Sequence, residues 1–547
     1  MGSKTLAVIL AACAASAWAA GVNLLQNPGF EESSVSGGEN LLLNPGFEES
    51  SCPDSSNGGT WGWYKDGAIQ TPGWRGGGNA GIAKSGNATW RPTGTGAWTA
   101  FIQHYRPDNA GLNSFIEQTV RTPADGVYEF ACDVARRDGY ETGWIGLSVG
   151  DGQTTRECEA IPYFTKGCKR AVWRLVLKGG LDYTLRLHQF DGLEQDTAAL
   201  IDNCSFVFCG AHALPKGRGT PTLHLTDLYR PHDDPDDHWD LATQFALAKV
   251  GAIDLRGVII DYPSTAVRAR SVKTAETSQP DIAAVAQMNW LTGLCVPTGV
   301  GQPDRGLPLC SGLTLLKRAL EAAKEPVALH VVGSCKDVAE AGRLWPELFK
   351  AKVKGIYLNA GTAAQGGELE WNVALDPRTY AATFALPCPI YWMPCFDTVG
   401  KTGVHDTWWR FRMARAFERM RPPVKNFFNG VFGKRNPSDW LASLDEPVDQ
   451  ASLDKTGELL RNMWCTAGFL HAAGLTVWKD GTIAKLDEEP AKEVFRFVPV
   501  TVTCGDDGRT AWQPAETSDT RFLFEIADKE GYPEAMTRAL IELMSVL

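Results

Sequence analysis

The chain has 547 residues, of which 44% are hydrophobic, and it contains 56 glycines and 31 prolines. This length predicts two or three domains, and the composition is that of a loop-rich globular protein. The net charge of −11 argues against a nucleic-acid polymer or an anionic membrane surface as the main partner.

Residues 1–19 have the pattern of an export signal. Lys4 supplies the positive charge, Leu6–Ala15 is apolar but too short to span a bilayer, and Ala17-Trp18-Ala19 fits a cleavage site. The sequence therefore predicts a secreted or periplasmic protein. A lipid anchor at Cys13 is the alternative, because Leu10-Ala11-Ala12-Cys13 has the form of a lipobox. No later segment is long and apolar enough to predict a membrane span.

A tandem repeat follows the signal. Asn23–Ser34 recurs almost unchanged as Asn40–Ser51. A domain needs only one first strand, so we expect the second copy to belong to a folded domain. Residues 20–39 are then a duplicated N-terminal segment.

Residues 40–209 alternate between apolar and polar side chains in short runs separated by glycine-rich turns. Strands are expected at 115–120, 127–134, 144–149, 171–177, 183–188 and 199–207. Many short strands without helices predict a β-sandwich. Six aromatic residues could stack on sugar rings or pack the ends of the sandwich. They are Trp61, Trp63, Tyr64, Trp74, Trp90 and Trp98.

The two ends of this region carry a resemblance. Asn40-Leu-Leu-Leu-Asn-Pro-Gly-Phe-Glu-Glu49 and Ala199–Val207 resemble the carbohydrate-binding, galactose-binding-like jelly rolls of bacterial exoproteins. The resemblance implies a jelly-roll fold and a carbohydrate partner, of which a polysaccharide is one candidate.

After a linker at 210–220, the hydrophobic period changes. In 221–547, apolar strands expected at 221–226, 254–260, 295–297, 327–332, 355–358 and 389–393 alternate with helices expected at 236–250, 280–292, 311–323, 336–349 and 377–386. This order predicts an α/β domain with a largely parallel, doubly wound sheet. A C-terminal extension is expected to hold helices at 406–419 and 454–474, strands within 475–485, 495–503 and 521–527, and a last helix at 532–546.

Six aspartates lie where the first of these strands gives way to the first helix. They are Asp227, Asp233, Asp234, Asp236, Asp237 and Asp240. Carboxylates this close repel one another, and a bound cation relieves the repulsion. The alternative is a solvated acidic loop. Position favours the site, because ligands bind at the carboxyl ends of strands in α/β folds.

The region from about 221 to 480 resembles the inosine–uridine-preferring nucleoside hydrolases. The resemblance rests on Thr226-Asp227 with Asp236-Asp237-His-Trp-Asp-Leu-Ala242, on Val331–Ala339, and on Glu368–Pro377. It implies a Ca²⁺ ion held by Asp227, Asp236, Asp237 and the backbone carbonyl of Lys336. Asp227 would also be the general base for the attacking water.

The same resemblance implies that Glu370 and Asn372 hold ribose hydroxyls and that Asp261 stands near the substrate. Asp376-Pro377 fits an ordinary helix cap better than a catalytic group. The family closes its metal site with a late His-Asp pair. This chain has His471 but Ala472, so a ligand is lost, and Asp233, Asp234 or Asp240 are possible substitutes. His471 could still protonate a leaving base.

These features predict an exported hydrolase that cleaves an N-ribosyl or related glycosidic bond with Ca²⁺-activated water. Two alternatives stay open: a glycan-active hydrolase on the same fold, and a non-catalytic sugar-binding protein. The chain has fourteen cysteines, whose pairing the sequence does not give.

Overall fold

The computed structural model describes residues 39–52, 60–66, 69–84, 96–104, 114–137, 139–140, 143–152, 155–158, 161–163, 169–189, 197–211, 219–230, 236–262, 279–294, 296–302, 310–364, 369–397, 403–432 and 442–547. The chain divides into two compact units near residue 215. The export signal, Cys13, the first copy of the repeat, Asp233, Asp234 and Trp90 lie outside the described residues. No helix in the described part of the chain is long and apolar enough to cross a bilayer.

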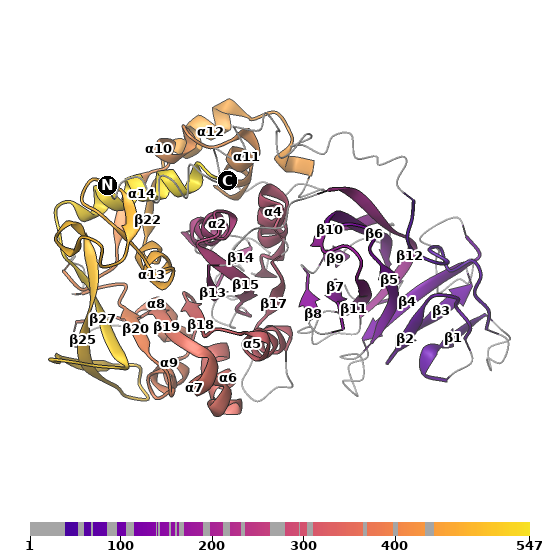
Figure 1. Ribbon diagram of the computed structural model, residues 1–547, viewed down its shortest axis with the longest axis horizontal. Coiled ribbons are helices and arrows are strands. Elements are labelled where there is room, and N and C mark those ends of the chain that lie inside the picture. The colour runs from indigo at the N-terminus through magenta and orange to yellow at the C-terminus, as the bar shows by residue number, and fades with distance from the viewer. Residues whose placement is uncertain are drawn as a thin grey trace. The chain divides into compact units, whose positions relative to one another are not determined.

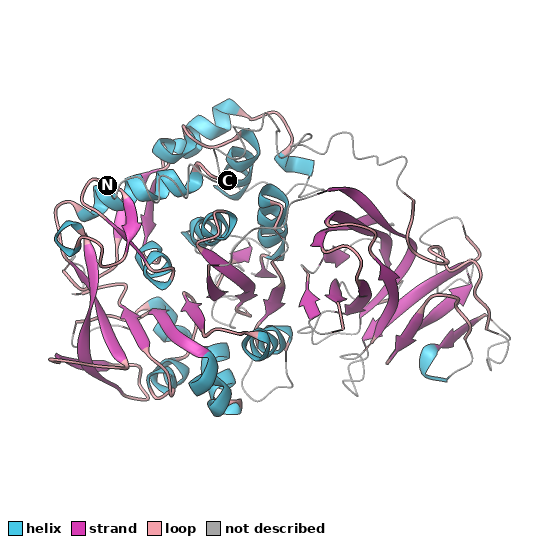
Figure 2. Ribbon diagram, in the orientation of Figure 1, coloured by secondary structure: helices cyan, strands magenta, loops and turns pink. Residues whose placement is uncertain are grey.

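The first unit is a β-sandwich, as the sequence predicts (Figures 1 and 2). One six-stranded sheet has the order β1-β3-β4-β12-β6-β10, and the other has the order β2-β5-β11-β7-β8 with β9 paired to β7. The strands are β1 (Trp61–Trp63), β2 (Arg75–Gly77), β3 (Ala80–Lys84), β4 (Trp98–His104), β5 (Phe115–Arg121), β6 (Gly126–Arg136), β7 (Gly143–Gly150), β8 (Thr155–Glu157), β9 (Ile161–Tyr163), β10 (Lys169–Leu177), β11 (Asp182–Gln189) and β12 (Thr197–Ala211).

The sandwich core forms because alternate side chains of both sheets point inward. Phe130, Trp173 and Leu187 are among its fully buried members. The second copy of the repeat is built into this unit. Asn40 donates from Nδ2 to the carbonyl of Cys204 at 3.1 Å, and its Oδ1 accepts from the amide of Phe206 at 2.9 Å. The N-terminal segment is thereby fixed to the last strand.

The second unit is built on a nine-stranded sheet of order β17-β15-β13-β18-β19-β20-β27-β25-β26. Its strands are β13 (Thr220–Thr226), β15 (Ile253–Ile260), β17 (Thr298–Val300), β18 (Val327–Val331), β19 (Val353–Asn359), β20 (Ile390–Met393), β25 (Phe495–Cys504), β26 (Thr510–Pro514) and β27 (Arg521–Ile526). Every pair from β15 to β27 in this order is parallel, whereas β25 pairs antiparallel with both β27 and β26. The predicted largely parallel sheet is confirmed.

Helices cover both faces of this sheet (Figure 2). One face packs its apolar side chains, including Leu223 and Leu329, against α5 (Ser311–Ala322), α6 (Lys336–Leu344) and α9 (Pro377–Phe384). The remaining helices are α2 (Asp236–Lys249), α4 (Ile282–Thr292), α7 (Pro346–Lys352), α8 (Trp371–Leu375), α10 (Ala414–Phe417), α11 (Pro422–Phe432), α12 (Gln450–Gly457), α13 (Thr466–Ala472) and α14 (Tyr532–Met544).

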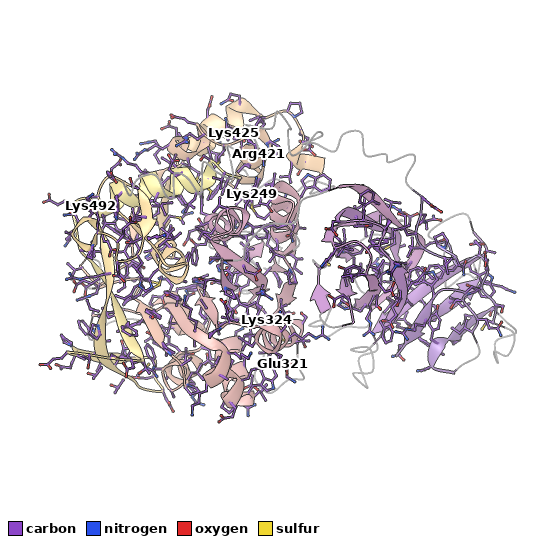
Figure 3. The ribbon with its side chains drawn as sticks, viewed as in Figure 1. Lys249, Glu321, Lys324, Arg421, Lys425 and Lys492 are labelled. Carbon is purple, nitrogen blue, oxygen red and sulfur yellow. The ribbon has the colours of Figure 1, made fainter. Side chains whose placement is uncertain are left out.

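The C-terminus is anchored to this unit. Lys249 donates from Nζ to the main-chain oxygen of Leu547 at 3.3 Å, and Arg421 donates from Nε to the same oxygen at 2.5 Å (Figure 3). Burial lowers the pKa of Lys249 to about 8, and the neighbouring Arg421 contributes to the shift. The last helix is therefore part of the fold, as the sequence predicts.

Four expected elements differ from the structure. The helix expected at 336–349 is broken at Trp345 into α6 and α7, where Pro346 starts the second helix. The short strand expected at 295–297 lies instead at β17.

The helices expected at 406–419 and 454–474 are interrupted by strands β21 (Trp409–Arg412) and β22 (Leu460–Met463), which pair antiparallel. Trp409, Phe411 and Met463 are buried in this ribbon. Long-range pairing here outweighs the local helical period.

Candidate active site

Aspartates gather at the carboxyl edge of the parallel sheet. β13 ends at Thr226 and β15 at Ile260, and the next residue of each is an aspartate. The amide of Asp261 donates to the carbonyl of Thr226 at 2.9 Å, which holds the ends of the two strands in line. Asp227 and Asp261 are both buried.

Asp227 lies against the segment that follows β18. A Cβ added to Gly333 would lie 2.8 Å from the amide nitrogen of Asp227 and 3.1 Å from its Oδ1. Only a residue without a side chain fits at this distance. The glycine therefore lets the β18 loop approach the predicted base directly.

Asp261 forms a buried carboxyl pair with Asp337. The two side chains are neighbours, Asp261 Oδ2 accepts from the amide of Ser334 at 2.7 Å, and Asp337 Oδ1 accepts from the amide of Gln302 at 3.0 Å. Burial, and then the charge of Asp261, raise the pKa of Asp337 to about 7. Carboxyls this close share a proton, since both cannot ionise without strong repulsion.

Lys336 is the cation beside this pair. Its Nζ donates to the carbonyl of Tyr262 at 2.9 Å and to that of Gln302 at 3.4 Å. Its charge lowers the pKa of Asp261 against the larger effect of burial, so that the pKa of Asp261 is raised overall. The residue whose carbonyl was predicted to bind metal thus also places a positive charge next to the carboxyl pair.

Tyr229, which the sequence did not single out, stands among these carboxylates. Burial raises its pKa well above the usual value, and four neighbouring carboxylates add to the shift. They are Asp261, Asp227, Asp237 and Asp337. The predicted residues Asp227, Asp237 and Asp261 are therefore brought into one cluster around a phenol that stays protonated.

The first turn of α2 supplies the other side of the cluster. Asp236 and Asp237 are its first two residues, and Asp240 lies one turn further on. All three are buried. Negative charge is stabilised at a helix N-terminus by the helix dipole, which offsets part of their mutual repulsion.

Cys465 meets this turn from the other side. It is the N-cap residue of α13 and is buried. Burial raises the pKa of its thiol well above the usual value, and the neighbouring carboxylates of Asp240, Asp236 and Asp237 raise it further. The residue at α13 that faces the acidic cluster is thus Cys465. The resemblance to the hydrolases instead implies that the position of Ala472 faces the metal site.

His471 lies toward the opposite edge of the sheet. The carbonyl of its neighbour Ala472 accepts from Nζ of Lys354, near the start of β19, whereas Cys465 donates to Asn359 at the end of β19. His471 Nδ1 hydrogen-bonds to the hydroxyl of Tyr357 at 2.8 Å, and burial lowers its pKa to about 3. The structure does not bring His471 to the acidic cluster, because α13 runs the length of the strand away from it.

Glu370 and Asn372 lie at the start of α8, beside the segment that contacts Asp227. Both carboxylate oxygens of Glu370 accept main-chain hydrogen bonds, Oε2 from Gly361 at 2.8 Å and Oε1 from Asn372 at 2.9 Å. Glu370 is thus the N-cap of α8. Asp376 likewise caps α9, as expected, by accepting from the amide of Thr379 at 3.2 Å.

The side-chain oxygen of Asn372 can accept a hydrogen bond from a ligand. Its Nδ2 donates to the carbonyls of Val332 at 3.2 Å and Asn359 at 3.3 Å. Its Oδ1 is buried and accepts no hydrogen bond from the residues the structure describes. Because Val332 precedes Gly333, the amide of Asn372 is bonded to the same loop that touches Asp227.

The charge of the cluster suits a cation, but the side chains alone do not form a complete cage. Among the described residues, no three His, Cys, Asp or Glu side chains are placed to hold one metal ion together. Backbone carbonyls, such as that of Lys336, are further oxygen ligands of the kind Ca²⁺ takes.

In the first unit, the aromatic residues named from the sequence separate into two groups. Trp74 and Trp98 are buried, and Tyr64 packs against the core. Trp61 and Trp63 lie on β1 rather than in a loop, are partly exposed, and meet edge to face with ring centroids 5.7 Å apart. They pack on a separate apolar cluster outside the sandwich core, formed by Ala83, Phe101, Ala135 and Leu200.

No family model matches the sequence, and no curated protein matches it. Among solved structures, an inosine–guanosine nucleoside hydrolase is similar to 59% of this chain over 99% of its own length, with 14% identity and a TM-score of 0.34. An inosine–uridine-preferring nucleoside hydrolase from Bacillus anthracis has the same coverage and identity, with a TM-score of 0.27. A CBM22 xylan-binding domain from Paenibacillus barcinonensis is similar to 32% of this chain over 97% of its own length, with 14% identity and a TM-score of 0.21.

Proposed function

We propose that the second unit is a hydrolase that cleaves an N-ribosyl or related glycosidic bond. The observation that carries this proposal is the buried cluster of aspartates at the carboxyl edge of a parallel sheet, with the open amide oxygen of Asn372 in α8 bonded to the adjoining loop. Hydrolysis of a glycosidic bond passes through an oxocarbenium-like state, which carboxylates stabilise. A hydroxyl-rich sugar also needs acceptors such as this amide oxygen.

We propose Ca²⁺ as the cofactor, with the carboxylates of Asp227, Asp236 and Asp237 and the carbonyl of Lys336 as its ligands. Because no three of the described side chains are placed to hold one ion together, binding would require these carboxylates to close around it. When bound, the ion would lower the pKa of a water molecule and so make it a better nucleophile. The crowding of buried carboxylates, with Lys336 as their nearby cation, supports a divalent ion here.

The chain's own groups then have separate tasks. Asp227 accepts the proton of the attacking water, and Gly333 keeps the loop close enough to hold that carboxylate in place. Asn372 Oδ1 accepts from a sugar hydroxyl. Glu370 acts mainly by fixing the start of α8, and Asp261 by bridging to the β18 loop through Ser334. Tyr229 lies among these groups and His471 does not.

The test is release of free base or sugar from a panel of nucleosides, nucleotides and aryl glycosides, followed by chromatography. Asp227→Asn should lower turnover by about a thousandfold, the size of effect expected for loss of a general base. Asp449→Asn is the matched control, because Asp449 is also a carboxylate that loses one charge, and it only caps α12. Equal activity of the two variants would refute the assignment.

Calcium binding is measured separately by calorimetry on chelator-treated protein. Asp237→Asn should weaken binding, whereas Asp449→Asn should not. If the unmodified protein shows neither heat of binding nor turnover of any substrate, the proposed hydrolase is refuted, and the alternative of a non-catalytic binding protein is the one left to test.

For the first unit we propose carbohydrate binding on the surface that carries Trp61 and Trp63. Partly exposed aromatic rings that pack against buried apolar side chains are suited to stacking against sugars. A polysaccharide held there favours the alternative of a glycan-active hydrolase. Retention on insoluble polysaccharides tests the binding, and turnover of a glycan without turnover of any nucleoside would decide for that alternative.

We also propose that the protein is exported and that residues 1–19 are removed. Sequencing the N-terminus of the protein recovered outside the cytoplasm should give a chain that begins near Ala20. A chain that begins at Cys13 with an attached lipid would support the anchored form instead.

A further inference from the structure

Two buried thiols at the candidate active site share one acceptor atom. Cys465 donates from Sγ to Oδ1 of Asn359 at 3.2 Å, and Cys395 donates from Sγ to the same oxygen at 3.7 Å. The two sulfur atoms are therefore separated by no more than the sum of these distances. Both cysteines are reduced in this structure.

The segments that carry the two thiols are also tied to each other. Cys395 follows β20, and its carbonyl accepts from Nε1 of Trp464 at 3.1 Å. Trp464 directly precedes Cys465, so the segment that carries Cys465 is bonded to the backbone of Cys395. The amide of Cys395 in turn donates to the carbonyl of Gly361 at 2.9 Å. The fold thus holds the two cysteines together although they are far apart in the sequence.

We propose that Cys395 and Cys465 form a reversible disulfide that controls the acidic site. In the presence of a small-molecule disulfide, one cysteine loses its proton and attacks, which forms a mixed disulfide and releases one thiolate. The second cysteine then displaces the remaining thiol, so the protein loses two hydrogens and the reagent gains them as two thiols. Closure to an S–S bond of about 2.05 Å requires rotation of at least one side chain away from Asn359.

A disulfide would change the contacts that Cys395 and Cys465 make near the proposed substrate site. Oxidation removes both thiol donors from Asn359 Oδ1, while the main-chain carbonyl of Asn359 holds Asn372. It also moves the side chain of Cys465, which lies beside Asp240 near the start of α2. The disulfide would therefore displace groups on both sides of the proposed substrate site. This effect on activity rests on the proposed function, whereas formation of the bond rests only on the geometry of the thiols.

A second close pair offers an internal comparison. Cys132 on β6 and Cys204 on β12 are neighbours in the core of the first unit. Any general oxidant can link this pair too, so the experiment must identify which cysteines are joined.

The full-length reduced protein is incubated with oxidised glutathione, blocked with N-ethylmaleimide, digested without reductant and mapped by mass spectrometry. The expected product is a peptide pair joined through Cys395 and Cys465, which separates on addition of dithiothreitol. Cys395→Ser should abolish this pair, whereas Cys388→Ser, which removes a buried cysteine nearby in sequence, should leave it intact. Absence of the joined peptide while Cys132 and Cys204 become linked would overturn the proposal.

Activity is measured on the same samples. Oxidised protein should bind Ca²⁺ or turn over substrate about tenfold less well, the size of effect typical of disturbed supporting groups around a site, and dithiothreitol should restore it. Cys395→Ser should be insensitive to the oxidant. A joined peptide with unchanged activity would refute the control function alone. If the reduced protein is itself inactive, the proposed hydrolase fails, and the peptide map still decides on the disulfide.

Discussion

Two fully buried histidines on neighbouring strands predict a loss of stability in mild acid. His224 of β13 pairs in register with His330 of β18, and Phe469 meets both rings edge to face, at 5.5 Å and 4.9 Å between centroids. No described residue hydrogen-bonds to either imidazole. Burial lowers the pKa of His224 to about 3, and burial together with the charge of His224 lowers that of His330 well below its usual value.

The sign of the effect follows from where the protons bind. Between the folded pKa of about 3 and the ordinary value of 6.5, the unfolded chain takes up a proton at His224 that the folded chain does not. Stability is therefore fully present above pH 6.5 and is lost as the pH falls below it. At pH 5 the unfolded state gains about 2 kcal/mol from this one group relative to neutral pH.

The perturbation is His224→Phe, which keeps an aromatic ring of similar size but cannot be protonated. Hydrogen exchange of peptides from β13 and β18, followed by mass spectrometry at pH 5 and pH 7.5, reports the opening free energy of this unit apart from the first. The difference between the two pH values should shrink by about 2 kcal/mol in the variant. His405→Phe, at a half-buried histidine elsewhere in the unit, is the control.

Comparison with the unmodified protein at each pH cancels the contributions of other titrating groups. Asp337 and Asp406, whose pKa values burial raises to about 7 and about 6, work in the opposite direction, because they favour the folded state in acid. Parallel pH dependences for His224→Phe and the unmodified protein would show that the histidine is hydrated and accessible, and the reasoning would be wrong.

Three further predictions test the cluster. Asp337→Asn should raise the free energy of unfolding at pH 9 relative to that at pH 5 by up to about 4 kcal/mol, compared with the unmodified protein, because folding raises the pKa of this carboxyl to about 7 and its ionisation at high pH is unfavourable. Denaturant unfolding at both pH values measures this change. The same difference between the two pH values in variant and unmodified protein would contradict the shared proton. Gly333→Ala should displace Asp227 and abolish Ca²⁺ binding in calorimetry, whereas Gly430→Ala, with open space around the new methyl group, should bind normally. Trp63→Ala should reduce retention on polysaccharide columns without altering unfolding of the second unit, and unchanged retention would exclude this surface.

The sequence was enough to predict the architecture of both units, because the strand alternation of the first and the apolar strands and helices of the second are local properties of the chain. Alternation in residues 40–209 predicts the sandwich, and continuous apolar runs separated by helices predict a parallel sheet buried on both faces. It failed around Trp409 and Met463, where two segments with helical patterns pair as strands. That pairing depends on a partner distant in sequence, which no local period reveals.

The candidate site shows the same division. Clustered aspartates after β13 predicted an acidic site, and the structure joins Asp227, Asp237 and Asp261 around Tyr229. Only the tertiary structure decided which end of α13 faces that cluster. Because the helix runs back along β19, its N-cap Cys465 meets the carboxylates and His471 lies among aromatic rings near the other edge. The local pattern of the sequence predicts which residues form a helix. The direction in which the helix packs against the sheet decides which of those residues reaches the site.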